Sequence, residues 1–217
     1  MPVAPRSSKG WVLCADILGF KNEMTGDKTS IKKKLKQLET LWTASSSSIS
    51  GTSILVSDSL FIHWPCATDE TAEVSKQFTL ARGDVRNLLD RFCSYGFFLR
   101  GSIAYGDVIM SSSMWAGAAL FRAHTLESSV INAPLVVMPE NECARISREA
   151  LSEVPSNDLT TKEGGILRFR VILPRKLDDF EMRLSERYDL LRVHGPADAA
   201  RKINNALTAL REIRRPI

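Results

Sequence analysis

The sequence predicts an α+β protein built on the split βαβ plan of ferredoxin-like folds. One reason is the apolar pattern of the first half of the chain, which changes in the order strand, helix, strand, strand, helix, strand. The length agrees with one such domain, because 217 residues can bury a full core. In this plan, the end of the first strand and the turn of the following hairpin lie side by side at one edge of the sheet.

Hydrophobic spacing and turn residues define the predicted elements. In chain order these are a strand at 11–17, a helix at 29–44, strands at 53–56 and 60–64, a helix at 70–95, a strand at 97–105 and a helix at 117–129. Gly96 supplies a C-terminal stop for the long helix. Gly106 is expected to break the strand before it, and Asp107 is interpreted as a turn residue.

The chain continues beyond this plan. Further strands are predicted at 135–138 and 166–172, and the residues after them carry apolar side chains at helical spacing. Residues 1–175 are therefore expected to form one domain, with 176–217 as a helical extension packed on it.

Composition excludes few classes of protein. The net charge of +4 suits a polyanionic substrate without requiring nucleic acid or a membrane. A basic tail with Arg211, Arg214 and Arg215 lacks the aromatic platforms typical of nucleic-acid binding, so no direct nucleic-acid partner is expected. No stretch resembles a signal peptide or is long enough to span a bilayer, which favours a cytoplasmic protein without membrane contact. The four cysteines are scattered and are expected to be reduced.

Two acidic residues at the edges of apolar strands are the most informative feature. Asp16 lies near the end of the first strand, and Asp58 lies in the turn between the second and third strands. A buried strand rarely carries a carboxylate unless the charge is paired or bound to a metal. Each aspartate alone could equally be a capping or turn residue. Side by side, they predict a site that holds two divalent cations, Mg²⁺ or Mn²⁺, over a triphosphate.

The turn that follows Asp16 fits the same prediction. A backbone carbonyl beside the two carboxylates would complete a set of hard oxygen ligands. The backbone of Leu18, Gly19 and Phe20 leads toward a helix and is placed to offer amide groups to a triphosphate. Gly19 matters because bare backbone can approach a phosphate closely.

Four segments resemble the motifs of class III nucleotidyl cyclases, in the family's order. They are Asp-Ile-Leu-Gly-Phe at 16–20, Ser-Asp-Ser-Leu-Phe at 57–61, the strand 99–108 with its Arg-Gly-Ser-Ile sequence, and the helix 117–127. In the second motif Ser57 stands where glycine is usual. The resemblance implies a nucleotidyl cyclase catalytic domain within residues 1–175, in which the ribose 3′-hydroxyl attacks the α-phosphorus and pyrophosphate leaves.

The family's site residues can be carried over where the motifs match. The resemblance implies that Asp16 and Asp58 are catalytic and hold two divalent cations, Mn²⁺ or Mg²⁺, together with the backbone carbonyl of Ile17. It implies substrate contacts for Ile17, Leu18, Gly19 and Phe20, and for Arg100 on a neighbouring strand. Family members bind substrate between two head-to-tail subunits, so a homodimer with composite active sites is implied.

The positions that usually read a purine depart from the family. Ile54 and Met114 stand where a lysine and an aspartate normally contact the base. Phe121 and Thr125 stand where an asparagine orients the ribose and an arginine stabilises the transition state. Arg122 is a candidate replacement for that arginine, one helical step from the usual face. Bulky apolar side chains at 54 and 114 would shrink the base pocket, which favours a pyrimidine.

The chain keeps the two metal-binding aspartates and lacks the side chains that usually contact a purine. In both respects it resembles the pyrimidine cyclases of bacterial Pycsar antiphage systems. That resemblance implies a uridylate cyclase that converts UTP to cUMP, which then activates a downstream effector protein. UTP is preferred to CTP only because that activity is the commoner one in the resembled group. A cytidylate cyclase making cCMP and a catalytically silent nucleotide sensor are the alternatives. A palm-type polymerase or diguanylate cyclase is disfavoured because the Gly-Gly-Asp/Glu-Glu-Phe hairpin of the diguanylate enzymes is absent.

The remaining ionisable residues have ordinary interpretations. Glu127 is expected to cap or pair on its own helix, with a place at the dimer interface as the second interpretation. His63, His124 and His194 have no partner at metal-ligand spacing and are expected to be structural.

Overall fold

The computed structural model describes residues 6–20, 27–111, 114–160 and 166–214. Its strands are β1 (Arg6–Ile17), β2 (Thr52–Val56), β3 (Ser59–Pro65), β4 (Leu99–Met110), β5 (Trp115–Ala116), β6 (Val136–Pro139), β7 (Ser156–Thr160) and β8 (Ile166–Ile172). Its α-helices are α2 (Lys28–Ser46), α3 (Thr71–Ser94), α4 (Ala118–Thr125), α5 (Arg148–Leu151), α6 (Leu177–His194) and α7 (Ala197–Ile213). A π-helical turn (Leu126–Val130) follows α4, and a 3₁₀ turn (Glu140–Arg145) follows β6.

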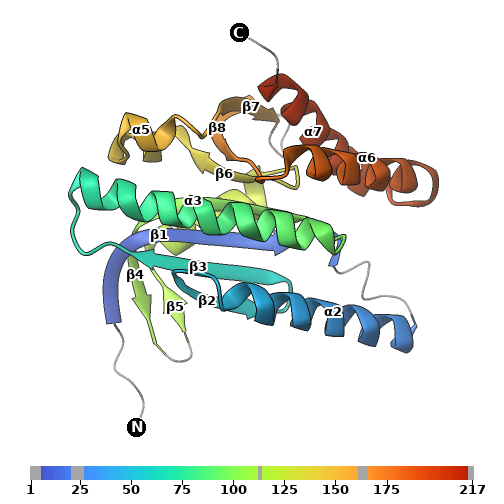
Figure 1. The fold of residues 1–217 in the computed structure, drawn as a ribbon, viewed down its shortest axis with the longest axis horizontal. Coiled ribbons are helices and arrows are strands. Elements are labelled where there is room, and N and C mark those ends of the chain that lie inside the picture. The colour runs from blue at the N-terminus through green and yellow to red at the C-terminus, as the bar shows by residue number, and fades with distance from the viewer. Residues whose placement is uncertain (1–5, 21–26, 112–113, 161–165, 215–217) are drawn as a thin grey trace.

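The described strands form one sheet in the order β2-β3-β1-β4-β6-β8-β7, with β5 paired to β4 off this path. β1 lies between β3 and β4 and is antiparallel to both, and β2 lies beyond β3. This is the predicted βαββαβ arrangement, so the α+β fold class is confirmed. In Figure 1 the long helix α3 lies in front of the sheet, nearly parallel to β1, with α2 below it and the C-terminal helices above.

Alternating side chains of β1 supply the two faces of the sheet. Trp11 and Leu13 belong to the core cluster that includes α3, where the ring of Trp11 lies 5.1 Å from that of Phe78. Val12 and Cys14 belong to the opposite face and pack against small residues of α4. Asp16 has the same parity as Val12 and Cys14, so its side chain belongs to the α4 face.

The predicted break at Gly106 is wrong. β4 continues through Gly106 and Asp107 to Met110, and Asp107 pairs with Lys9 in the β1 ladder. The strand continues because β1 begins at Arg6, earlier than predicted, and supplies a hydrogen-bonding partner for the extra length. Gly106 has a φ of 154°, and a Cβ there would lie 3.2 Å from the Arg122 guanidinium. Glycine therefore fits this position because the Arg122 side chain approaches the backbone closely, and not because the chain turns here.

The later strands extend the sheet on the side of β4. β6 is parallel to β4, β8 is antiparallel to β6, and β7 forms the far edge of this path. β7 was not predicted, because its Ser-Asn-Asp-Leu-Thr sequence has no apolar alternation. The helices α6 and α7 share one apolar cluster with this half of the sheet, in which Phe98 meets Phe180 edge-on at 5.9 Å.

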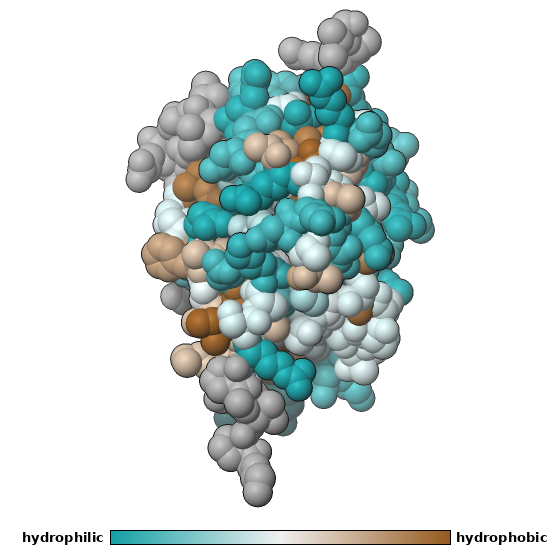
Figure 2. Space-filling model, turned by 90° about the vertical axis from the view of Figure 1, so that its left-hand side faces the viewer, coloured by the Kyte–Doolittle hydropathy of each residue, from teal (hydrophilic) through white to brown (hydrophobic). Residues whose placement is uncertain are grey.

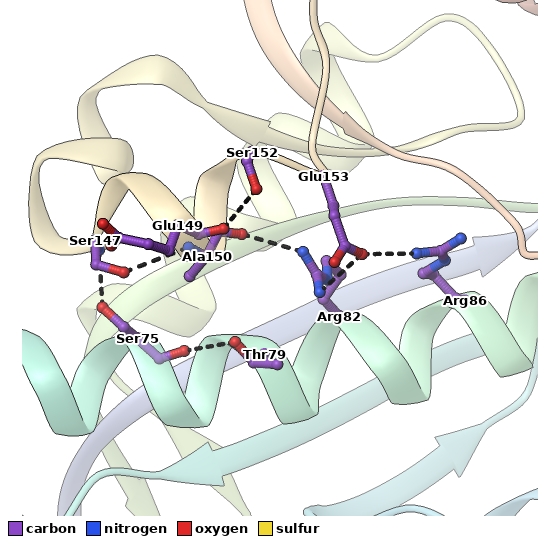
Figure 3. Close-up of polar contacts among 9 residues, drawn as sticks. All are labelled: Ser75, Thr79, Arg82, Arg86, Ser147, Glu149, Ala150, Ser152 and Glu153. Carbon is purple, nitrogen blue, oxygen red and sulfur yellow. Dashed lines mark hydrogen bonds and ion pairs between the residues drawn. The ribbon is translucent and has the colours of Figure 1, made fainter.

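A polar brace joins α3 to the segment around α5 (Figure 3). The hydroxyl of Ser75 accepts a hydrogen bond of 2.8 Å from the Ser147 amide. The guanidinium of Arg82, almost fully buried, donates to the carbonyl of Ala150 at 3.1 Å and lies 3.1 Å from the Glu153 carboxylate. These contacts fix the position of a helix that has only one turn and buries no side chain of its own.

Among the described helices, none combines the length and apolar character that a membrane span requires. The face at the left of Figure 1 is largely hydrophilic, with hydrophobic side chains scattered over it (Figure 2). Scattered exposed apolar residues are ordinary for a globular protein.

Candidate active site

Asp16 and Asp58 meet at one end of the sheet. Asp16 is the penultimate residue of β1 and pairs with Ser59 of β3. The amide of Ile17 donates a hydrogen bond of 3.0 Å to the Asp58 carbonyl, which ties the β2–β3 turn to the end of β1. The strand order therefore brings together two carboxylates that are far apart in the sequence.

The turn that carries Asp58 is tight. Only Ser57 and Asp58 separate β2 from β3, and Val56 pairs directly with Ser59. Ser57 has a φ of 59°, in the left-handed region that glycine occupies more easily. Two-residue hairpin turns of type II′ place glycine at this first position, which explains why glycine is usual in the resembled motif.

The electrostatics of the pair favour a bound cation. Burial, followed by the negative charges of Asp58 and Glu127, raises the pKa of Asp16 to about 7, while Arg100 opposes the shift. Neighbouring carboxylates repel when both are ionised, and a divalent cation relieves that repulsion. Within the described residues, no set of three or more His, Cys, Asp or Glu side chains is arranged as a metal site. Remaining ligands would have to come from oxygens such as the Ile17 carbonyl or a substrate phosphate, which Mg²⁺ and Mn²⁺ accept. The donor set fits such a cation.

Arg100 joins this group from the neighbouring strand. It pairs with Asp16 in the β1–β4 ladder, and its Nη2 atom lies 3.4 Å from Asp16 Oδ2. The same Nη2 atom lies 2.5 Å from Glu127 Oε1. Glu127 therefore pairs across to the sheet. Sequence reasoning missed this partner, although Glu127 follows Ala119 and Ala123, both buried, at helical spacing.

The turn after β1 is held from both sides. The Leu18 amide donates to the Phe98 carbonyl at 2.8 Å, so this amide is already used within the chain. The side chains of Leu18 and Phe20 pack against two different apolar clusters. Gly19 between them has a φ of 78°. Gly19 therefore lies between two residues whose side chains are packed.

The other predicted site residues lie elsewhere on the chain. Ile54 is 39% exposed on β2, and Met114 is 67% exposed between β4 and β5. Arg122 donates to the Tyr105 carbonyl and pairs with Glu142 at 3.4 Å. Tyr105 pairs with Trp11, which lies roughly 16 Å along β1 from Asp16. Within the part of the chain that is described, no hydrogen bond or ion pair joins these three residues to the carboxylate pair.

A groove of about 300 Å³ runs beside α4. It is lined by Phe121, Arg122, Thr125, Leu126, Pro139, Asn141 and Glu142. Phe121 and Thr125, one helical turn apart, both face it, and Phe121 is 72% exposed. These are the two positions that correspond to the ribose and transition-state residues of the resembled family. In one copy of the chain, this groove and the carboxylate pair are separate features.

The sheet order and the position of the carboxylate pair define the class of fold. It is the fold of the catalytic domain of class III nucleotidyl cyclases. The adenylyl cyclase CyaB from P. aeruginosa has 15% sequence identity and a TM-score of 0.52, covering 80% of this chain and 98% of that one. The monomeric guanylyl cyclase domain of the RhoGC fusion protein from Blastocladiella emersonii has 15% identity and a TM-score of 0.57, covering 80% of this chain and all of that one.

A third solved structure was obtained with nucleotide. It is the guanylate cyclase domain of RhGC from Catenaria anguillulae in complex with GTP, with 12% identity, a TM-score of 0.54 and coverage of 79% of this chain and all of that one. No family model and no curated protein sequence matches the chain. At these sequence identities, the similarity shows the fold alone.

Proposed function

We propose that this chain is a nucleotidyl cyclase that converts a pyrimidine nucleoside triphosphate, UTP first, to its 3′,5′-cyclic monophosphate and pyrophosphate. The observation that carries the proposal is the meeting of Asp16 and Asp58 at the end of β1, on a sheet shared with adenylyl and guanylyl cyclases. Residues 1–175 are assigned to the catalytic domain and 176–217 to its extension.

The roles of the residues follow from their chemistry. Asp16, Asp58 and the Ile17 carbonyl would hold two divalent cations, Mn²⁺ or Mg²⁺, which would supply positive charge beside the ribose 3′-hydroxyl and the phosphates. The 3′ oxygen forms a bond to the α-phosphorus, the bond from that phosphorus to the bridging oxygen breaks, and pyrophosphate leaves. The hydroxyl proton passes to solvent. Arg100, whose guanidinium lies beside Asp16, binds the triphosphate as negative charge shifts toward the leaving group.

Base choice rests on the apolar character of the positions that usually read a purine. Ile54 projects from β2 on the same face as Asp16, since it pairs with Phe61, and Phe61 pairs with Cys14. An isoleucine there has no donor or acceptor for a purine edge. Together with Met114, it narrows the space for the base and favours a pyrimidine.

A complete site needs a second copy of the chain. In the proposal, the groove beside α4 of one subunit faces the carboxylate pair of the other, so that Arg122 reaches the α-phosphate from across the interface. The exposed apolar side chains of Ile54, Met114 and Phe121 suit an interface better than solvent. The cyclic product would act as an antiphage second messenger on an effector protein. A cytidylate cyclase and a silent nucleotide sensor are the alternative functions.

Product analysis tests the proposal directly. The purified protein is incubated with Mn²⁺ and ATP, GTP, CTP or UTP in separate reactions, and products are resolved by mass. We expect cUMP from UTP, abolished by Asp58→Asn. Asp158→Asn is the matched control, because Asp158 is half-exposed, pairs with Arg168 on the β7–β8 hairpin and has no role in the site. Its activity should equal that of the wild type.

The outcomes separate the candidate functions. Product from CTP alone identifies the cytidylate cyclase. Cyclic AMP or cyclic GMP as the main product contradicts the pyrimidine assignment. Absence of any product, with UTP binding unchanged in Asp58→Asn, contradicts the enzyme and supports the sensor.

A further inference from the structure

One guanidinium is shared unequally between two carboxylates at the candidate active site. Arg100 Nη2 is 2.5 Å from Glu127 Oε1 and 3.4 Å from Asp16 Oδ2. The side chains of Arg100 and Glu127 are 11% and 7% exposed, against 24% for Asp16. The closer and drier contact is therefore the one with Glu127, and Asp16 keeps the more accessible carboxylate.

The local structure directs Glu127 to this place. Ala119, Ala123 and Glu127 follow one another at four-residue spacing on the buried side of α4 and the turn after it. The two alanines bring the helix close to β1 and β4, where Ala123 packs against Cys14 and Ala104. The turn then widens, because the Ile131 amide donates to the Leu126 carbonyl five residues earlier. Such π-helical turns are rare and occur frequently at functional sites.

We propose that Glu127 is a positioning residue that takes the closer contact with the Arg100 guanidinium and so limits the pairing of Arg100 with Asp16. It thereby leaves the Asp16 carboxylate available to a divalent cation and keeps the guanidinium in place for an anionic phosphate. This inference rests on the proposed function and concerns the same site.

The charges explain why such a residue is needed. Asp16 and Asp58 must present negative charge to cations, yet a cationic side chain lies within 3.4 Å of one of them. Arg100 already contacts Asp16 at 3.4 Å, and without Glu127 it would have Asp16 as its nearest carboxylate. A closer ion pair between the two would compete directly with a metal. Outer carboxylates that orient the groups around a metal change its affinity in the same way.

A purely structural role for Glu127 gives a different expectation. If it only neutralised a buried arginine, its loss would lower stability and leave metal binding unchanged. Glu153 shows what such a pair looks like. It lies 3.1 Å from Arg82 in the brace between α3 and α5, and that arginine is also 11% exposed (Figure 3). Glu153→Gln is therefore a matched control for the loss of an arginine partner outside the site.

The test measures metal binding first and activity second. Free Mn²⁺ is followed by electron paramagnetic resonance while the protein of residues 1–217 is titrated. Glu127→Gln keeps the size and a hydrogen-bonding group but removes the charge. We expect Glu127→Gln to weaken Mn²⁺ binding on the order of 10-fold and to raise the KM for the nucleotide, with a smaller change in kcat. Glu127→Asp should recover part of both, and Glu153→Gln should change only the melting temperature.

A second background separates action through Arg100 from any direct effect. In Arg100→Gln protein no guanidinium competes for Asp16, so adding Glu127→Gln should leave Mn²⁺ binding unchanged. Equal weakening in both backgrounds, or a lower melting temperature as the sole effect, overturns the inference. Wild-type protein that binds Mn²⁺ but forms no cyclic nucleotide overturns the proposed function alone. Wild-type protein that binds no Mn²⁺ overturns both.

Discussion

The turn that carries Asp58 holds a serine in a conformation better suited to glycine. Ser57 is exposed and has a φ of 59°. A residue with a Cβ loses about 1–2 kcal/mol in the left-handed region. Glycine loses about 0.5–1 kcal/mol more backbone freedom on folding than alanine does. The difference predicts that Ser57→Gly raises the free energy of unfolding by about 0.5–1 kcal/mol, because an exposed serine gives up little packing.

Urea denaturation followed by circular dichroism measures this change, and thermal unfolding should show a rise of about 2 °C for 1 kcal/mol at this chain length. Ser59→Gly is the control. Ser59 begins β3 and pairs with both Val56 and Asp16, so glycine there should lower the free energy of unfolding by about 0.5–1 kcal/mol. If the Ser57 variant loses stability as the Ser59 variant does, the reasoning from backbone strain is refuted.

Three further predictions concern parts of the fold outside the site. Burial lowers the pKa of His63 to about 4 from its ordinary 6.5, so between these values the unfolded chain binds a proton that the folded chain does not. The free energy of unfolding should fall by up to about 3 kcal/mol as the pH drops from 6.5 to 4. Urea denaturation at several pH values should show a smaller fall for His63→Leu than for the wild type. Equal dependence of the unfolding free energy on pH in both proteins would contradict this. Gly83 lies inside α3, and apart from its own helical backbone no atom lies within 4 Å of the place that an alanine Cβ would take. Gly83→Ala should therefore raise the free energy of unfolding by about 0.5–1 kcal/mol in the same assay. Arg82→Met removes the contacts with Ala150 and Glu153 and should cost about 1–2 kcal/mol while nucleotide turnover stays unchanged; a loss of turnover at a temperature where the variant is folded would argue against a purely structural brace.

The juxtaposition of Asp16 and Asp58 could be predicted because it depends on strand order alone. Apolar periodicity identifies β1, β2 and β3 locally, and the split βαβ plan then fixes which ends are neighbours. No individual side-chain contact has to be known. The same reasoning predicts the hairpin around Ser57 and Asp58 and the stop of α3 at Gly96, whose φ is 80°.

The pairing of Arg100 with Glu127 could not be predicted in this way. It depends on how closely α4 approaches the sheet and on the wide turn at Leu126, neither of which a helical pattern specifies. A sequence signal was nevertheless present, since Glu127 continues the stripe of Ala119 and Ala123. A carboxylate at a buried position needs a partner, and the nearest strand offers an arginine.

The prediction at Gly106 failed for a tertiary reason. Glycine followed by aspartate is typical of a turn, and local preference was overruled by a partner strand long enough to continue the ladder. The extension exists because β1 starts at Arg6, in a polar sequence that shows no alternation. Edge strand β7 also has a polar sequence without alternation, so apolar periodicity does not predict it.

Because β1 lies between β3 and β4, the two carboxylates of the candidate site stand on backbone that should exchange its amide hydrogens at different rates. β1 is hydrogen-bonded to β3 on one side and to β4 on the other as far as Asp16, so its amides should exchange with deuterium only when the whole sheet opens. Asp58 stands instead on a two-residue turn between β2 and β3, beside the outer strand of this half of the sheet, where opening can be local. The backbone at Asp16 should therefore open only when the whole sheet unfolds, whereas the backbone at Asp58 can open locally. A ligand that bridges them should slow exchange at the turn and leave β1 unchanged.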